Sequence, residues 1–208
     1  MVRAKICGIT RAEDALLAEQ LGAWAVGFIL AAGTKRYLEP QQVRPISTAL
    51  GPFITRVGVF VNAPPEAVLE TMQTAKLQVV QLHGNEPPQW AEEIRQHYPL
   101  IKVFTLDGPA LPDWSDYPCD ALMVDGTTPG SGRGYPSEWL TPLLKHPRLI
   151  VAGGLNPGNV EQVLALRPYA VDVSSGVEAA PRIKDPAQLA AFLQKVNRFE
   201  CPAVPEPG

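Results

Sequence analysis

The chain has little cysteine, no long apolar run and no excess of basic charge, and each shortage excludes a class of protein. Among 208 residues, 18 are lysine or arginine and 21 are aspartate or glutamate, which gives a formal net charge of −3. The sequence has no basic stripe, so a nucleic-acid partner has no electrostatic support. The longest apolar stretch, LGAWAVGFILAAG, covers about 13 residues, whereas a membrane helix needs about 20. We therefore expect neither nucleic acid nor a membrane as a partner.

The three cysteines, Cys7, Cys119 and Cys201, are an odd number without the spacing of a metal site. No histidine or cysteine pair has ligand spacing, so we expect no metal and no metal cofactor. The N-terminus lacks the continuous apolar core of a signal peptide. These absences predict a reduced, cytoplasmic protein.

Eight short apolar runs, rich in valine, isoleucine and phenylalanine, alternate with stretches of helical spacing at about 26 residues per unit. Near-continuous apolar strands indicate burial on both faces, as in a parallel sheet covered by helices. We predict an α/β fold, a single (β/α)8 TIM barrel of eight parallel strands over residues 1–198, with an irregular proline-rich tail over 199–208. An open doubly wound sheet is the alternative, although no two runs resemble edge strands. The runs are VRAKIC, WAVGFIL, ITRVGVFV, QVVQLH, IKVFTL, ALMVDG, RLIVAGG and AVDVSSG.

Several helix starts are predicted from local signals. Thr10 and Glu13 fit a capping box ahead of the first helix. Asn156 and Asp185 each precede a proline, a pattern typical of a cap residue before the first turn, and are expected to begin the last two helices. The proline-spotted segment after the fifth run predicts an irregular helix.

In a barrel of this class, catalytic groups lie at the carboxyl ends of the strands and on the loops that follow. Because all strand ends meet at one rim, several titratable side chains are expected to converge there. The polar residues at these positions are Cys7, Arg36, Asn62, His83, Asp107, Asp125 and Asp172.

Small residues follow the seventh and eighth strands, where many barrels bind phosphate. Gly153 and Gly154 end one strand, and Ser174, Ser175 and Gly176 end the next. Glycines allow backbone N–H groups to approach an anion, and a short helix beginning near Ser175 would direct its positive end at it. The alternative is that these glycines only form tight turns. The glycine-rich loop over residues 126–138 is either a lid over a ligand or an ordinary surface loop.

Cys7 is either a small buried apolar residue or a general base. A base must be a thiolate, which at the ordinary pKa of a cysteine requires a nearby cation, and Arg36 or Lys5 could supply one. Asp125 and Asp172 follow apolar strand residues, where a carboxylate is costly without partners. His83 either contacts the substrate or forms a structural hydrogen bond, and its residue type fits both roles.

The motifs KICGIT, VGVFVN, VQLHG, VDG, AGGLNPGNV, VDVSSGVE and KD, in this order, resemble the N-(5′-phosphoribosyl)anthranilate isomerase family over about residues 3–197. The resemblance implies a (β/α)8 barrel and an aldose-ketose isomerase of tryptophan biosynthesis. The implied reaction is an Amadori rearrangement of N-(5′-phosphoribosyl)anthranilate to 1-(2-carboxyphenylamino)-1-deoxyribulose 5-phosphate, without cofactor or metal.

The resemblance also implies roles for individual residues. Cys7 is the general base that removes the proton from C2′, and Asp125 is the general acid that protonates the ring oxygen. Arg36 faces the anthranilate part, while His83 and Asp172 lie at the pocket rim. The phosphate lies on Gly153, Gly154, Ser174, Ser175 and Gly176.

Three stretches depart from the family pattern. The loop before Arg36 lacks a Ser-Pro pair, the end of the loop over 126–138 differs, and Arg182 stands where a glycine is common. Two rival functions follow from the same residues. One is the related sugar-phosphate isomerase of histidine biosynthesis, which has two phosphate loops, whereas only one appears here. The other is a non-catalytic barrel that binds a phosphorylated ligand. A monomer and a homodimer are both compatible with the sequence.

Overall fold

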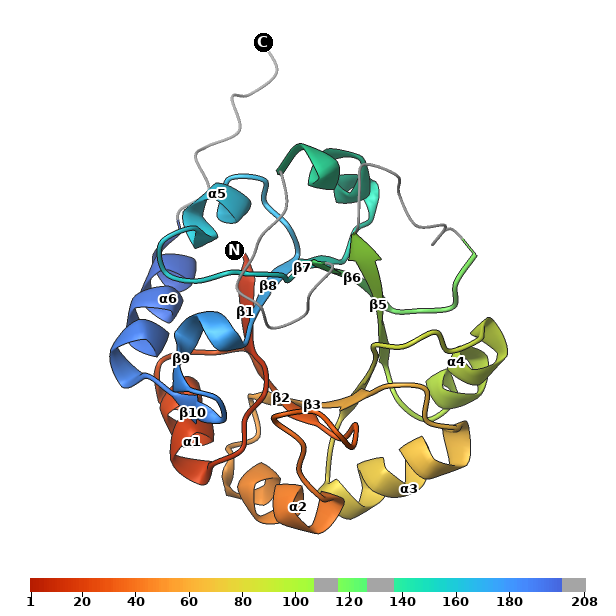
Figure 1. Ribbon diagram of the computed structural model, residues 1–208. Helices are drawn as coiled ribbons and strands as arrows, with labels where there is room; N and C mark the ends of the chain where they lie inside the picture. Colours follow the sequence, from red (N-terminus) through yellow and green to blue (C-terminus); the bar gives the residue numbers. More distant parts are fainter. Residues whose placement is uncertain (107–115, 127–136, 200–208) are drawn as a thin grey trace.

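The computed structural model describes residues 1–106, 116–126 and 137–199, which form a closed eight-stranded barrel (Figure 1). All eight strands pair in parallel and in chain order, and β1 pairs with β8 to close the ring. The predicted fold is confirmed, because one strand lies over each of the eight apolar runs. The strands are β1 (Arg3–Ile6), β2 (Ala25–Ile29), β3 (Thr55–Phe60), β4 (Val79–Leu82), β5 (Leu100–Leu106), β6 (Ala121–Gly126), β7 (Leu149–Val151) and β8 (Ala170–Val173).

Helices surround the ring of strands in Figure 1. They are α1 (Ala12–Gln20), α2 (Pro40–Ala49), α3 (Pro65–Ala75), α4 (Pro88–Arg95), α5 (Val160–Leu164) and α6 (Pro186–Arg198), with 3₁₀ helices η1 (Ser137–Lys145) and η2 (Ser175–Val177). An antiparallel hairpin of β9 (Glu178–Ala180) and β10 (Ile183–Lys184) follows η2. The hairpin was not predicted, because its sequence is short and polar. No helix of the described part is long and apolar enough to cross a membrane.

The capping box expected at α1 is wrong. The N-cap is Arg11, without a side-chain cap hydrogen bond. The Thr10 hydroxyl instead donates to the carbonyl of Arg182 in the hairpin, at 2.6 Å, and Glu13 accepts from Arg11 at 2.7 Å. A tertiary contact has therefore replaced the local one.

The two later helix starts have opposite outcomes. Asp185 caps α6 as predicted, because its carboxylate accepts hydrogen bonds from the N–H groups of Ala187 and Gln188. Asn156 does not cap α5, which begins four residues later at Val160. Its side-chain oxygen accepts from the N–H of Gly158 at 2.7 Å and closes a turn ahead of the helix.

Three predictions concern segments that lie wholly or largely outside the described residues. They are the irregular helix after β5, the loop over 126–138 with its lid role, and the tail after 198. The domain boundary at 198 stays a prediction.

Two apolar layers hold the barrel together. One packs the strands against the helices and includes Phe28 and Phe192, and the other fills the barrel interior around Ile101 and Met123. The interior is therefore a packed core and not a pore. Lys5, Gln81, Asp125 and Asp172 are buried polar residues that interrupt these layers. Buried charges need partners, which directs attention to the strand ends where they meet.

Candidate active site

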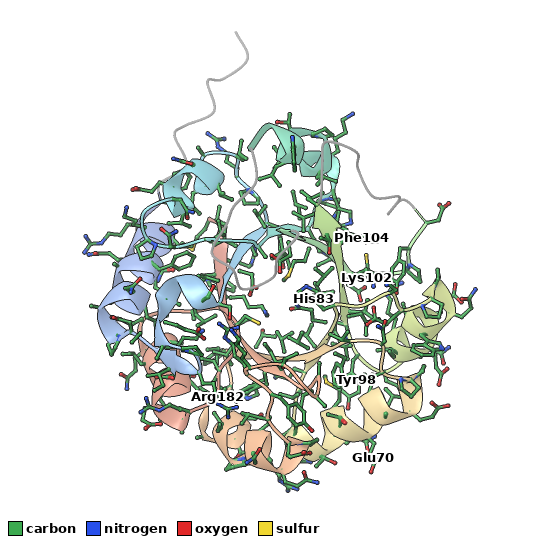
Figure 2. All side chains as sticks on the ribbon, in the orientation of Figure 1. Glu70, His83, Tyr98, Lys102, Phe104 and Arg182 are labelled. Carbon is green, nitrogen blue, oxygen red and sulfur yellow. The ribbon has the colours of Figure 1, made fainter. Side chains whose placement is uncertain are left out.

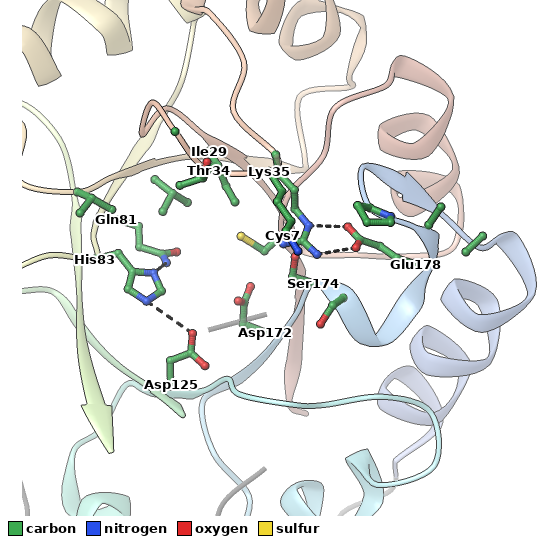
Figure 3. Close-up of a pocket in the computed structure, with 18 residues that line it drawn as sticks. Cys7, Ile29, Thr34, Lys35, Gln81, His83, Asp125, Asp172, Ser174 and Glu178 are labelled. Atoms are coloured by element: carbon green, nitrogen blue, oxygen red, sulfur yellow. Dashed lines mark hydrogen bonds and ion pairs between the residues drawn. The ribbon is translucent and has the colours of Figure 1, made fainter. Parts of the chain in front are cut away.

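A cavity of about 730 Å³ opens at the carboxyl ends of the strands (Figure 3). Figure 2 shows the side chain of His83 inside the ring of strands, whereas Glu70 lies on the outer surface of α3. Most predicted site residues line this cavity: Cys7, Arg36, His83, Asp125, Asp172, Ser174 and Ser175. The remaining three, Gly153, Gly154 and Gly176, line a small adjoining cavity shared with Asp125 and Asp172.

The other two candidates do not join this group. Asn62 is exposed at the end of β3, and its side-chain oxygen accepts from the N–H of Asn85 in the next loop, at 2.7 Å. Asp107 lies outside the described residues.

Cys7 is buried directly after β1, and its N–H donates to the carbonyl of Val173 at 2.8 Å. Lys5, two residues earlier on β1, points to the same side of the strand. Its ammonium group lies 2.7 Å from a carboxylate oxygen of Asp172 on β8. Gly27 on β2 leaves room for both, since a Cβ there would lie 2.9 Å from Cys7 Sγ and from Lys5 Nζ.

The ionisation of Cys7 is governed by opposing influences. Burial raises the pKa of the Cys7 thiol and is the largest effect. Lys5 lowers that pKa, Asp172 raises it, and Lys184 lowers it. The net result is a pKa above the ordinary cysteine value, so the free protein carries a thiol at neutral pH. Lys5 is thus one of the cations that the sequence placed near Cys7, and it favours the thiolate, although desolvation outweighs its effect.

Asp125, at the end of β6, faces His83 across the cavity, with Oδ2 3.6 Å from Nε2. Its other oxygen accepts the N–H of Gly126 at 2.8 Å. Burial, followed by the charge of Asp172, raises the pKa of Asp125 to about 6. Burial also lowers the pKa of His83, which favours a neutral imidazole. A carboxyl group with this pKa can hold and release a proton near neutrality.

Gln81 on β4 is a pocket residue that the sequence analysis missed. Its side-chain nitrogen lies 3.4 Å from His83 Nδ1. Its side-chain oxygen is buried in the pocket without a hydrogen-bond partner among the described residues. The signal was present, because residues two apart on a strand share a face and His83 was already a candidate.

The loops after β7 and β8 form a narrow cradle. Gly153 and Gly154 adopt φ values of 86° and 67°, in the left-handed region that favours glycine. A Cβ on Gly176 would overlap the carbonyl oxygen of Leu155, so only glycine fits there. The hydroxyl of Ser174 is buried with no hydrogen-bond partner in the described part of the chain. An anion accepts hydrogen bonds from free hydroxyl and backbone donors of this kind.

Arg36 lies in the loop after β2 and forms a bidentate ion pair with Glu178 of the hairpin. Nε and Nη2 lie 2.7 and 2.6 Å from the two carboxylate oxygens. Dashed lines mark the two hydrogen bonds to Glu178 in Figure 3. The pairing fixes the guanidinium plane at the pocket edge. Glu178 and Lys184, which contact each other at 3.3 Å, were both missed. A lysine in the polar stretch PRIKD is usually exposed, and nothing local indicates its burial.

The chain was compared with families and proteins of known identity. Residues 4–195 match the family model described as N-(5′-phosphoribosyl)anthranilate isomerase. An enzyme of that name from Thermotoga petrophila is 41% identical over 206 residues, covering 95% of this chain and 99% of the relative.

Solved structures agree with the sequence relatives. Phosphoribosyl anthranilate isomerase from Thermus thermophilus superimposes with a TM-score of 0.91 at 56% identity, covering 94% of this chain and 98% of that one. A structure described as mutually generated monomers of the dimeric enzyme from Thermotoga maritima gives a TM-score of 0.86 at 37% identity, covering 96% of this chain and 100% of that one. A phosphoribosyl anthranilate isomerase in complex with reduced 1-(o-carboxyphenylamino)-1-deoxyribulose 5-phosphate gives 0.86 at 36% identity, with the same coverage.

Proposed function

The chain belongs to the N-(5′-phosphoribosyl)anthranilate isomerase family, and from this premise we propose how its pocket residues divide the reaction. The protein is an isomerase of tryptophan biosynthesis and converts N-(5′-phosphoribosyl)anthranilate to 1-(2-carboxyphenylamino)-1-deoxyribulose 5-phosphate. The reaction is an Amadori rearrangement, which needs one proton donated and one removed. The observation that supports our assignment is the placement of Cys7, directly after β1, and Asp125, on β6, around one cavity.

Asp125 is the general acid in this proposal. Opening of the ribose ring places negative charge on the ring oxygen, and a protonated carboxyl group neutralises it. The raised pKa of Asp125, about 6 because of burial and then of Asp172, keeps part of the population protonated near neutrality. His83 at 3.6 Å contacts this carboxyl group without adding a positive charge that would favour its ionisation.

Cys7 is the general base. Ring opening leaves a Schiff base, which acidifies the C2′ proton, so a thiolate suffices to remove it. Lys5 and Lys184 both favour the thiolate form against the larger effect of burial. The thiolate therefore forms as a minor species, and the fixed geometry of acid and base around the ligand supplies much of the rate.

The phosphate group of the substrate is proposed to bind the cradle of Gly153, Gly154 and Ser174–Gly176. The unpartnered hydroxyl of Ser174 and the space kept by Gly176 support this assignment. Arg36, held by Glu178, then faces the anthranilate part, and Asp172 anchors Lys5 beneath the reacting sugar. The relative in complex with a 5-phosphate ligand is consistent with an anion site in this fold.

The histidine-pathway isomerase needs a second phosphate site, at the ends of β3 and β4. In this chain the Glu86 carboxylate accepts the N–H groups of Asn62 and Gly84 there, at 2.9 and 3.0 Å. Lys102 pairs with the same carboxylate at 2.6 Å. Backbone donors that could bind a second phosphate are thus already bonded to a negative charge, which favours the anthranilate substrate.

The test is the loss of anthranilate-type fluorescence from freshly generated phosphoribosylanthranilate. Wild type, Cys7→Ala and Asp125→Asn are compared, with Cys119→Ser as the matched cysteine control. We expect rapid decay for wild type and Cys119→Ser, and loss of turnover by a factor of about 10²–10⁴ for the other two. Near-normal turnover of Cys7→Ala would remove the thiol from the mechanism, and measurable isomerisation of the histidine-pathway substrate would contradict the assigned specificity.

We further propose a homodimer. A relative 37% identical is described as dimeric. Phe53, in the turn before β3, is 97% exposed, and Thr55, two residues later, lines a cavity of about 490 Å³ at the opposite end of the barrel. An exposed aromatic residue beside an open cavity is typical of an interface. Analytical ultracentrifugation of wild type and Phe53→Asp should give a dimer and a monomer, and a monomeric wild type would refute the proposal.

The cytoplasmic location also stays a proposal. Cys7 and Cys119 are free thiols, as a reducing compartment requires. Cell fractionation followed by immunoblotting should find the protein with cytoplasmic markers, and recovery from another fraction would contradict it.

A further inference from the structure

The hairpin of β9 and β10 connects three loops of the active-site rim. Glu178 at its start holds Arg36 from the loop after β2. The guanidinium of Arg182 at its turn donates to the carbonyl of Tyr37 in the same loop, at 3.3 Å. Lys184 at its end extends towards the ends of β1 and β8. The hairpin is thus placed to determine how these loops lie relative to one another.

Lys184 is the most deeply buried of these three hairpin residues. It is only 2% exposed, and its ammonium group donates to the carbonyl oxygens of Cys7 at 2.7 Å and Ser174 at 2.9 Å. Glu178 accepts a third hydrogen bond at 3.3 Å. Three acceptors match the three N–H donors of an ammonium group, whereas a neutral amine has two. The backbone N–H of Lys184 donates to the buried Asp14 at 3.1 Å, which fixes the start of the side chain.

The two carbonyls belong to the proposed base and to the proposed phosphate cradle. We propose that Lys184 is a positioning residue that fixes the backbone of Cys7 to the phosphate loop and places a positive charge beside the thiolate during proton removal. This inference deepens the proposed function and rests on Cys7 being the base. Lys184 itself touches no reacting atom in this scheme and acts through Cys7 and Ser174.

Among the residues that the structure describes, four charged groups are identified that act on the ionisation of Cys7, each from a different element. They are Lys5 on β1, Asp172 on β8, Lys184 on β10 and Arg36 in the loop after β2. Lys5 is already paired with Asp172, and Arg36 with Glu178. Lys184 differs because two of its three partners are neutral carbonyls, so its charge is less compensated. Its removal should therefore make the thiolate harder to form.

The test measures the alkylation of Cys7 by iodoacetamide as a function of pH, in a Cys119→Ser, Cys201→Ser background that leaves one thiol. Lys184→Met should raise the midpoint of the profile by about one pH unit, because a cation beside the thiolate is lost. Lys184→Gln keeps two N–H donors and loses the charge, so it should show the same shift if Lys184→Met does not fold. Lys184→Arg keeps the charge and should restore most of the wild-type midpoint.

Steady-state kinetics separate positioning from stability. We expect kcat to fall about tenfold in Lys184→Gln, and inhibition by inorganic phosphate to weaken, because the shorter side chain cannot hold the carbonyls of both Cys7 and Ser174. Lys102→Met is the matched control, since Lys102 is similarly buried, but its partners, Glu86 and the carbonyl of Gly84, belong to the loop after β4. It should lower the melting temperature without moving the alkylation midpoint.

The outcomes separate this inference from the proposed function. Wild-type alkylation profiles for Lys184→Gln and Lys184→Met, with only a lower melting temperature, would make Lys184 a structural residue and overturn the inference. Full turnover by Cys7→Ala would instead overturn the assignment of Cys7 as the general base. The proposed positioning role of Lys184 in catalysis would then fail as well, whatever the alkylation profile.

Discussion

The ammonium group of Lys5 lies 2.7 Å from the carboxylate of Asp172, and both side chains are buried between β1 and β8. The two strands also pair at these residues, so the ion pair lies where the barrel closes. A buried charge that loses its partner retains the full cost of leaving water. Lys5 and Asp172 also act on the pKa of Cys7. The same ion pair therefore affects both the stability of the barrel and the ionisation of Cys7.

Asp172→Asn should lower the free energy of unfolding by about 3 kcal/mol, the cost of leaving Lys5 unpaired in the interior. Denaturation by urea measures it. The matched control is Glu161→Gln, which breaks the exposed pair with Lys195 and should cost less than about 1 kcal/mol. Equal effects of the two variants would contradict the argument. Replacing both partners in a Lys5→Met, Asp172→Leu variant should recover part of the loss.

Gly27 is predicted to be required for turnover more than for folding. A Cβ there would lie 2.9 Å from Cys7 Sγ and Lys5 Nζ, and these side-chain ends can move aside at small cost. Their movement displaces the base and its cation, so kcat of Gly27→Ala should fall by about tenfold to a hundredfold. Gly58→Ala is the control, because its Cβ would meet Leu77 and Phe60 on the outer face of β3. Gly58→Ala should lose stability and retain kcat, and the opposite pattern would refute this reasoning.

The sequence was sufficient to predict the barrel and most of the proposed site residues that line the pocket. Period and composition identified all eight strands, and the rule that catalytic groups follow strand ends selected Cys7, His83 and Asp125. Local signals were weaker where tertiary contacts compete, as at Thr10, whose hydroxyl bonds to the hairpin and not to α1. Arg182 stands at a position where a glycine is common in the family. Its φ is 79°, in the left-handed region that glycine favours, which explains why a glycine is common there.

What could not be predicted depends on contacts between distant segments. Lys184 bonds to the carbonyl of Cys7, 177 residues away in sequence. Glu178 is part of the same unpredicted hairpin. The sequence does not indicate that its two carboxylate oxygens accept hydrogen bonds from Arg36, which lies 142 residues away in sequence. The pKa of Cys7 likewise depends first on burial, which a sequence motif does not reveal.

Gly176 is predicted to control phosphate binding. Its Cβ would overlap the backbone oxygen of Leu155, which is unable to move as a flexible side chain does, so Gly176→Ala should displace the loop after β8. We expect KM to rise at least about tenfold and inhibition by inorganic phosphate to weaken in parallel. Gly158→Ala is the control, since its Cβ would meet only the side chain of Asn156, at 3.0 Å. An unchanged KM in Gly176→Ala would exclude this loop from phosphate binding.

The pH dependence follows from an inverted order of two pKa values. The reaction needs a protonated Asp125 and a Cys7 thiolate, but the pKa of Asp125 is about 6 and that of Cys7 is raised above its ordinary value, both chiefly by burial. Between the two values the prevailing form is carboxylate and thiol. That form has the same number of protons as the active form, so the active fraction is small but constant.

Below about pH 6 both groups hold protons and kcat/KM should fall about tenfold per unit, whereas above the pKa of Cys7 both have lost them and it should fall again. The rising limb therefore belongs to Asp125, although Asp125 is the acid. Because the charge of Asp172 raises the pKa of Asp125, Asp172→Asn should move that limb to lower pH. Initial rates at subsaturating substrate, measured across the pH range for both proteins, test the assignment. A kcat/KM that continues to rise beyond about pH 8 would follow the ionisation of Cys7 alone and would exclude Asp125 as the proton donor.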